Sequence, residues 1–182
     1  MRGQSWRDAL RRLFLAVADE LGAVFASAEV LVGNIWTGRS EFQIGTLLVT
    51  GLPTGNANGL MCVDAVQFAE PPLAALLEFR RVLASGGRLV LSCWEAVDPS
   101  DGQVPPRIHA VNLRRDLPAA GFVEVQVHDQ PEWREAERTM WKEMVAAQGD
   151  SDSAVRSLQT EGRRSLETFA SWRRVFATAT AP

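Results

Sequence analysis

The stretch from Asn58 to Glu95 (NGLMCVDAVQFAEPPLAALLEFRRVLASGGRLVLSCWE) constrains the fold more than any other part of the chain. It contains two apolar runs, Gly59–Ala65 and RLVLSCW, and neither shows a helical stripe. From Leu73 to Leu83 the apolar residues recur at helical spacing, and two prolines suit the first turn of that helix. Ser85-Gly86-Gly87 can stop it, because glycine accepts the left-handed conformation of a helix end. Two strands joined by a helix of about 14 residues predict a βαβ unit with parallel strands.

The carboxyl ends of such strands are where open parallel sheets bind ligands. The residues that follow the first run are Val63, Asp64, Gln67 and Phe68, and those that follow the second are Trp94 and Glu95. Each also has a plain structural interpretation. A loop carboxylate can cap the next helix, and Gln67, Phe68 and Trp94 can pack in the interior. The pattern alone leaves both alternatives open.

A known family shares these motifs. The segment EFRRVLASGGRLVLSCWE resembles the E-x-x-R-V-L-x-x-G-G-x-L segment of class I S-adenosylmethionine-dependent methyltransferases that act on small molecules. NGLMCVDAVQF is similar to the fourth strand of that family, GTLLVTGLP to the end of the third strand, and AAGFVEV to a later strand. The resemblance implies a Rossmann-like α/β sheet whose last strand is antiparallel. It also implies S-adenosyl-L-methionine as cofactor and a small organic molecule as methyl acceptor.

The resemblance also assigns roles to residues at the expected sheet edge. The positions implied for the cofactor are Thr46, Leu47, Val63, Asp64 and Phe68, and those implied for the acceptor are Gln67, Trp94 and Glu95. His109 is the candidate catalytic base for a hydroxyl acceptor, because an unperturbed histidine titrates near neutral pH. The alternative for His109 is an ordinary surface position early in a helix.

The sequence departs from the family in its first 40 residues. The family places several strands and helices between its Gly-rich cofactor loop and its fourth strand. Here Gly38, the last glycine of a faintly similar segment, precedes Asn58 by only 20 residues. Because crossovers need about 10–12 residues each, the Gly-rich half is expected to be missing and the sheet truncated. Thr46 and Asn58 also stand where the family has acidic residues.

Three functional hypotheses therefore remain. The chain is a methyltransferase with a degenerate or incomplete cofactor site, a non-catalytic methyltransferase-like protein that binds a partner, or a truncated fragment. The first is the prediction we carry forward, with enzymatic activity left uncertain.

We expect one domain over residues 1–182, in four segments. Residues 1–40 hold an amphipathic helix (5–26) and an atypical segment, and 41–130 form the α/β core. Residues 131–170 form a helical insertion that covers the carboxyl edge, and 171–182 hold the final strand. The predicted strands are Phe42–Val49, Gly59–Asp64, Arg88–Trp94, Phe122–His128 and Arg173–Ala179, with one helix over Arg107–Ala120.

Composition excludes several other classes. A net charge of −3 gives no general attraction to nucleic acid, and arginine pairs such as Arg173-Arg174 are interpreted as solvated faces. The sequence has no run of about 18 apolar residues, so it predicts no membrane span. The chain is expected to be cytoplasmic. Cys62 and Cys93 are expected to be free buried thiols, and with two histidines at unrelated spacing they predict no metal site. The sequence leaves open whether the chain forms a homo-oligomer.

Overall fold

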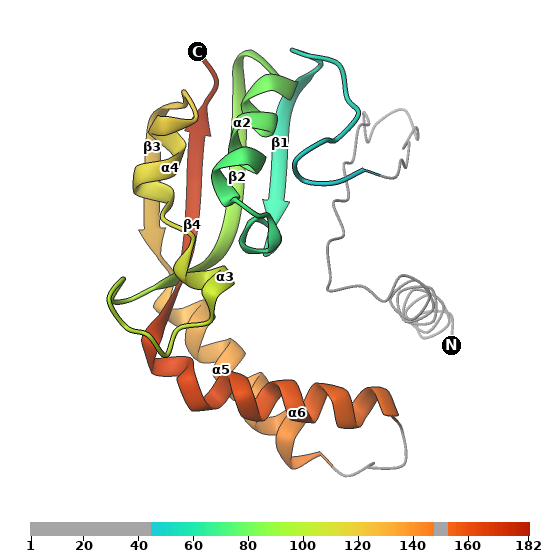
Figure 1. Ribbon diagram of the computed structural model, residues 1–182, viewed down its shortest axis with the longest axis vertical. Coiled ribbons are helices and arrows are strands. Elements are labelled where there is room, and N and C mark those ends of the chain that lie inside the picture. The colour runs from blue at the N-terminus through green and yellow to red at the C-terminus, as the bar shows by residue number, and fades with distance from the viewer. Residues whose placement is uncertain (1–44, 148–152) are drawn as a thin grey trace.

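The computed structural model describes residues 45–147 and 153–182, which form one mixed sheet flanked by helices (Figure 1). The strand order is β1-β2-β4-β3. β1 (Ala57–Val63) runs parallel to β2 (Leu83–Ala96), and β4 (Trp172–Thr180) lies antiparallel between β2 and β3 (Val123–Asp129). The parallel pair and the antiparallel last strand are confirmed. The helix expected over residues 5–26 lies outside the described residues.

The crossover between the parallel strands is shorter than the sequence predicts. It contains η2 (Val66–Phe68) and α2 (Pro72–Val82), and the helix ends where Leu83 turns to an extended conformation. β2 therefore begins at Leu83, which pairs with Ala57, well before the expected start at Arg88. Gly86 does adopt a left-handed φ of +77°, but it lies inside this long strand and not at the helix end.

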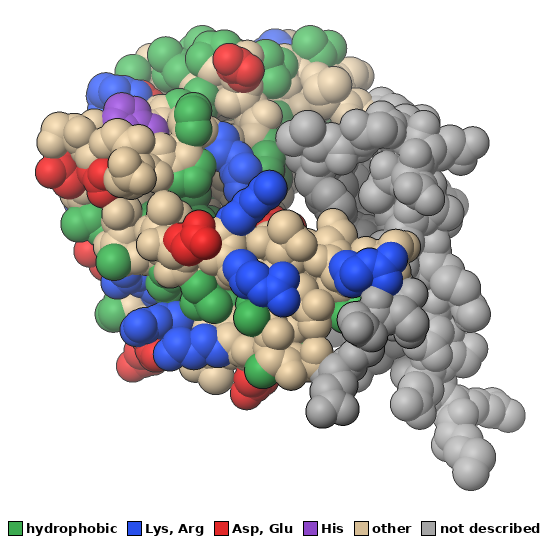
Figure 2. Space-filling view, turned by 60° about the horizontal axis from the view of Figure 1, so that its bottom comes forward, with side chains coloured by type: hydrophobic (Ala, Val, Ile, Leu, Met, Phe, Trp, Pro, Cys, Tyr) green, Lys and Arg blue, Asp and Glu red, His purple; other side chains and the backbone are tan. Residues whose placement is uncertain are grey.

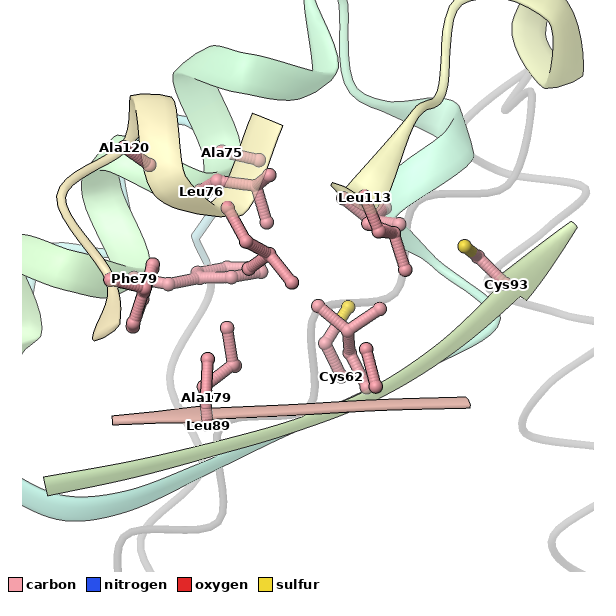
Figure 3. Close-up of a cluster of buried hydrophobic side chains, with 14 of the residues drawn as sticks. Cys62, Ala75, Leu76, Phe79, Leu89, Cys93, Leu113, Ala120 and Ala179 are labelled. Carbon is pink, nitrogen blue, oxygen red and sulfur yellow. The ribbon is translucent and has the colours of Figure 1, made fainter. Parts of the chain in front are cut away.

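The main core lies between one face of the sheet and two helices, α2 and α4 (Leu113–Ala119) (Figures 1 and 3). Alternate residues of β2 point into it, as expected of a strand whose side chains alternate between faces. The fully buried large side chains here include Leu76, Leu83, Leu89, Leu91, Leu113, Leu117 and Val175. Each buried leucine or valine contributes about 1.5–3 kcal/mol relative to an exposed one. This core fixes the register of the parallel pair.

The single helix predicted over Arg107–Ala120 is wrong. The structure has two helices, α3 (Pro106–His109) and α4. Asn112 separates them with an extended backbone, and its side-chain oxygen accepts a hydrogen bond from the backbone N–H of Arg115 at 3.0 Å. An asparagine cap of this kind starts a new helix. The apolar spacing continues across the break, so periodicity alone did not show it.

The strand predicted over Phe42–Val49 is also wrong for its described part. Residues 45–50 form a bend, in which the backbones of Thr46 and Val49 exchange hydrogen bonds of 3.0 and 3.2 Å. The Thr46 hydroxyl also accepts from the Val49 N–H at 3.0 Å. These local bonds satisfy the backbone groups that a neighbouring strand would otherwise pair.

The helical insertion before the last strand is confirmed. It consists of α5 (Pro131–Ala146), α6 (Ser153–Thr168) and the short η3 (Phe169–Ser171). The pair extends past the end of the sheet where β1 terminates (Figure 1). The two helices approach closely at Gly162, where a Cβ would lie 3.0 Å from both Trp141 and Val145. In the described part of the chain, no helix is long and apolar enough to cross a membrane.

Candidate functional site

The carboxyl end of β1 turns sharply at Asp64. This residue has a left-handed φ of +53°, a conformation in which aspartate is more common than most other side chains. Its backbone N–H still pairs with the Ser92 carbonyl at 2.9 Å, and Ser92 Oγ donates to its carboxylate at 2.8 Å. The turn places the Asp64 carboxylate at the edge between the two parallel strands. Strained backbone of this kind is concentrated at functional sites.

Arg174 of β4 is the centre of a charged cluster at this edge. Its guanidinium donates to Asp64, lies 3.7 Å from Glu137 of α5, and sits 5.0 Å from the centroid of the Trp94 ring. The Arg174 side chain is only 11% exposed, so the prediction that the Arg173-Arg174 pair lies on a solvated face is wrong for Arg174. Burial raises the pKa of Glu137, although nearby Arg174 opposes the shift. The cluster joins β1, β2, β4 and the insertion.

The side-chain oxygen of Gln67 is a hydrogen-bond acceptor without a donor among the described residues, and it lies beside this cluster. Its Nε2 donates to the Asp64 backbone carbonyl at 2.8 Å, which fixes Oε1 as the remaining group of the amide. Oε1 is buried and has no hydrogen-bond partner among the described residues. Because buried polar groups are almost always paired, this unpaired oxygen is a candidate partner for a ligand donor, although it is closed off from solvent and lines neither of the two cavities described below.

The two residues at the end of β2 are held within the fold. Trp94 is 6% exposed and packs edge-on against Phe169 and Trp172, with ring centroids 5.5 and 5.1 Å away. The Glu95 carboxylate accepts from the Leu113 N–H at 2.6 Å and from Arg173 at 2.8 Å. Both side chains thus have structural partners, and contact of either with an acceptor stays a prediction.

The other residues expected to contact the cofactor are in different surroundings. Leu47 is buried in the main core, whereas Thr46 and Val63 are exposed. Phe68 is partly buried, and the guanidinium of Arg107 lies 5.4 Å from the centroid of its ring. The structure therefore brings Val63, Asp64 and Phe68 together at the end of β1, with the turn at Thr46 beside the core.

His109 lies at the end of α3 and is exposed. Its Nε2 contacts the carbonyl oxygen of Pro99. Because a carbonyl only accepts, Nε2 carries the proton in that contact and Nδ1 is left as the basic nitrogen. None of the hydrogen bonds, ion pairs or ring contacts of the described residues joins His109 to Asp64 or Phe68, so its role as a base stays a prediction.

A largely apolar cavity of about 440 Å³ lies on the sheet face opposite the main core. Its walls come from β1, β2, β4 and α5, and its residues include Met61, Val63, Ser92, Trp133, Glu137, Arg174 and Phe176. The sequence pattern did not point to Arg174 and Glu137, because the pairing of β4 and the packing of α5 bring them to Asp64 from distant positions. A charged residue inside the apolar run WRRVF was the one available signal. Groups of three or more metal-ligating side chains are absent from residues 45–147 and 153–182.

Comparison by sequence finds no relative, since no family model and no curated protein matches the chain. Comparison of structures does. Phosphoethanolamine N-methyltransferase 2 of Haemonchus contortus, in complex with phosphomonomethylethanolamine and S-adenosylhomocysteine, matches 75% of this chain at a TM-score of 0.56 and 18% identity. Geranyl diphosphate C-methyltransferase of Streptomyces coelicolor A3(2) matches 77% at 0.54 and 16% identity. The (4+2)-cyclase SpnF matches 92% at 0.56 and 16% identity.

The matches cover different shares of the two chains. This chain spans 36% of the Haemonchus protein, 53% of the Streptomyces protein and 60% of SpnF. At such identities the likeness concerns the fold, and a cyclase among the matches shows that one fold serves different chemistries. The described residues have the Rossmann-like α/β fold of class I methyltransferases, with its parallel pair, its helical insertion and its antiparallel last strand.

Proposed function

We propose that this chain is a S-adenosyl-L-methionine-dependent methyltransferase of a small organic acceptor, with an incomplete cofactor site. The observation that carries the proposal is the left-handed turn at Asp64, with the unpaired Gln67 Oε1 beside it, at the carboxyl end of the parallel pair. Two of the structural relatives are complexes with S-adenosylhomocysteine. The buried amide oxygen of Gln67 and the carboxylate of Asp64 can accept hydrogen bonds from the amino groups of such a cofactor. The Phe68 ring suits its adenine ring.

The protein's own residues have a limited part in the reaction. The cofactor supplies an already activated methyl group, so the protein mainly aligns the acceptor and excludes water. Gln67 and Asp64 would accept hydrogen bonds from the bound molecules, and Arg174 holds the Asp64 carboxylate in place by donating to it. His109 would accept a proton through Nδ1 if the acceptor is a hydroxyl. The apolar cavity beside Glu137 offers an apolar surface on which part of the methyl acceptor could pack.

The sequence has no Gly-rich loop at the family's spacing, so cofactor binding is expected to be weak. Each lost hydrogen bond to a charged group costs about 1.5–3 kcal/mol. Two such losses weaken affinity by roughly 10²- to 10⁴-fold, since 1.4 kcal/mol is tenfold. A cytoplasmic location and a homo-oligomer remain predictions of the same proposal.

Calorimetric titration with S-adenosylhomocysteine tests the proposal. We expect weak binding by the 182-residue chain. Gln67→Leu should weaken the binding of S-adenosylhomocysteine by a further factor of about five, because the buried amide oxygen that accepts a hydrogen bond is lost. Gln126→Leu is the matched control, since Gln126 is exposed on the distant edge strand β3, and it should leave binding unchanged. Absence of binding at millimolar ligand would contradict the proposal and favour the partner-binding or the fragment alternative.

A further inference from the structure

A second hollow of about 620 Å³ lies between the start of α3 and one side of α6, which we name the α3–α6 groove. Its character differs from that of the apolar cavity. Arg107 lines it from α3, and Arg156, Thr160, Glu161 and Arg164 line it from α6. Figure 2, which views the end of the molecule that carries the helical pair, shows Lys and Arg side chains gathered near the middle of that face.

The groove has an excess of positive charge. Arg107 and Arg164 each bring a guanidinium group to the groove, which Arg156 also lines, and Glu161 is the one carboxylate among its lining residues in the described part of a chain whose net charge is −3. Arg107 and Arg164 are both exposed, and neither forms an ion pair with a carboxylate in the described ranges. The two exposed guanidinium groups of Arg107 and Arg164, neither paired with a carboxylate in the described residues, favour an anion between them. The planar guanidinium group matches the oxygen geometry of phosphate and carboxylate.

Polar groups of the groove add hydrogen-bond donors. Ser157 and Ser165 lie on the groove side of α6 along with Arg164. Trp172 also lines the groove and is only 5% exposed, yet its indole N–H has no acceptor within the described structure. An indole N–H can only donate, and a buried donor without a partner is rare in folded proteins. This unpaired donor is independent of the arginines and could pair with a ligand oxygen if the ring shifts, since the nitrogen itself is shielded from solvent in this structure.

The groove is connected to the candidate site through one residue. The guanidinium of Arg107 lies 5.4 Å from the centre of the Phe68 ring, and the same side chain lines the groove. Phe68 follows the turn at the carboxyl end of β1. A molecule held in the groove would therefore extend toward the edge at which the methyl donor is proposed to bind.

We propose that the α3–α6 groove binds a phosphate or diphosphate group of a small molecule. That this molecule is the methyl acceptor rests on the function proposed above, whereas binding of the phosphate group in the groove does not. Arginine forks and hydroxyl donors bind phosphate oxygens by charge-assisted hydrogen bonds. The end of the molecule that would receive the methyl group then lies toward Phe68.

Titration of the full chain with inorganic pyrophosphate, without any cofactor, tests the groove directly. Arg164→Gln should weaken pyrophosphate binding by about fivefold or more, because a charge-assisted contact is lost. Glu161→Gln should strengthen it about twofold, since it removes a like charge. The matched control is Arg163→Gln, an exposed position on the same helix that does not line the groove, which should change the affinity less than about twofold.

Each other result overturns the proposal. Equal weakening by Arg163→Gln and Arg164→Gln would show attraction to the whole helix surface. Equal or tighter binding of succinate would show a carboxylate site in place of a phosphate site. No pyrophosphate binding at millimolar concentration would remove the site. These outcomes are separate from the titration with S-adenosylhomocysteine, so the groove and the proposed methyltransferase function can fail independently.

Discussion

The guanidinium of Arg174 donates a hydrogen bond to the carboxylate of Asp64, which lies 110 positions earlier in the chain. The same guanidinium lies 3.7 Å from Glu137 and 5.0 Å from the centre of the Trp94 ring. One side chain of the last strand thus contacts the turn after β1, the end of β2 and the helical insertion. Its loss should affect the stability of the fold as well as the candidate site.

Replacing Arg174 with methionine should lower the free energy of unfolding by about 1–3 kcal/mol. Methionine keeps an apolar stem but leaves two carboxylates near each other without their cation. Urea denaturation measures the change. Arg138→Met is the matched control, because the Arg138–Glu135 pair is exposed on both sides and should contribute under about 0.5 kcal/mol. Equal losses in the two variants would show that the cluster does not stabilise the fold.

The Glu78 carboxylate should make stability depend on acid pH. Hydrogen bonds from Arg81, and then from Thr50, lower its pKa from 4.5 to about 2. A carboxyl group whose pKa is lower in the folded than in the unfolded state stabilises the fold at pH values above its unfolded pKa. This added stability is lost as the pH falls through the folded pKa. The wild type should therefore lose stability between pH 4.5 and about 2.

Glu78→Gln should be less stable than the wild type by about 1–3 kcal/mol at neutral pH, because it leaves the N–H of Arg81 without its anion. The difference between the two proteins should shrink across that acid window. Urea denaturation at several pH values measures it. A difference independent of pH would contradict the assigned pKa.

Gly162 should control the packing of the helical pair. A leucine there would meet the ring of Trp141 and the side chain of Val145, each only 3.0 Å from a hypothetical Cβ and so already closer than ordinary van der Waals contact. Overpacking of this kind costs about 1–3 kcal/mol. Hydrogen exchange should accelerate in α5 and α6 but not in the central strands, and faster exchange there in the wild type would support a mobile cover. Arg163→Leu, exposed on α6, is the control and should leave exchange unchanged.

The parallel pair could be predicted because Gly59–Ala65 and RLVLSCW are apolar runs that only a buried sheet accommodates. The last strand was equally clear from WRRVFATATA. Local hydrogen bonds were the source of error: the Asn112 cap split one predicted helix, and the Thr46–Val49 turn replaced a predicted strand. Such bonds involve single side chains and leave no periodic trace in the sequence.

The candidate site could be predicted only in part, for a related reason. Asp64 and Gln67 follow β1 directly, so their place at the sheet edge depends on sequence neighbours alone. Arg174 and Glu137 reach that edge through the pairing of β4 with β2 and the packing of α5 on β4. Trp94 and Glu95 lie inside β2, which continues past the predicted end at Trp94 to Ala96. Their partners Trp172 and Arg173 come from a strand far along the chain.

The two cysteines should resist thiol reagents as long as the sheet is closed. Cys62 and Cys93 are free and buried, on the neighbouring strands β1 and β2. Burial raises the pKa of the Cys62 thiol to about 11 and that of Cys93 well above its usual value. The thiolate is the reactive form, so near pH 8 roughly one Cys62 in a thousand is reactive even before access is considered. Ellman's reagent should therefore react slowly with the native protein.

In denaturant without a reducing agent, two thiols per chain should react at once, and Cys62→Ser or Cys93→Ser should each leave one. The slow native rate should follow the population of the form in which the parallel pair is open, since both thiols lie in the main core beneath α2 and α4 (Figure 3). Rapid labelling of the native chain would contradict the burial of β1. Failure of both thiols to react after unfolding would mean a disulfide between the strands, which the structure does not have.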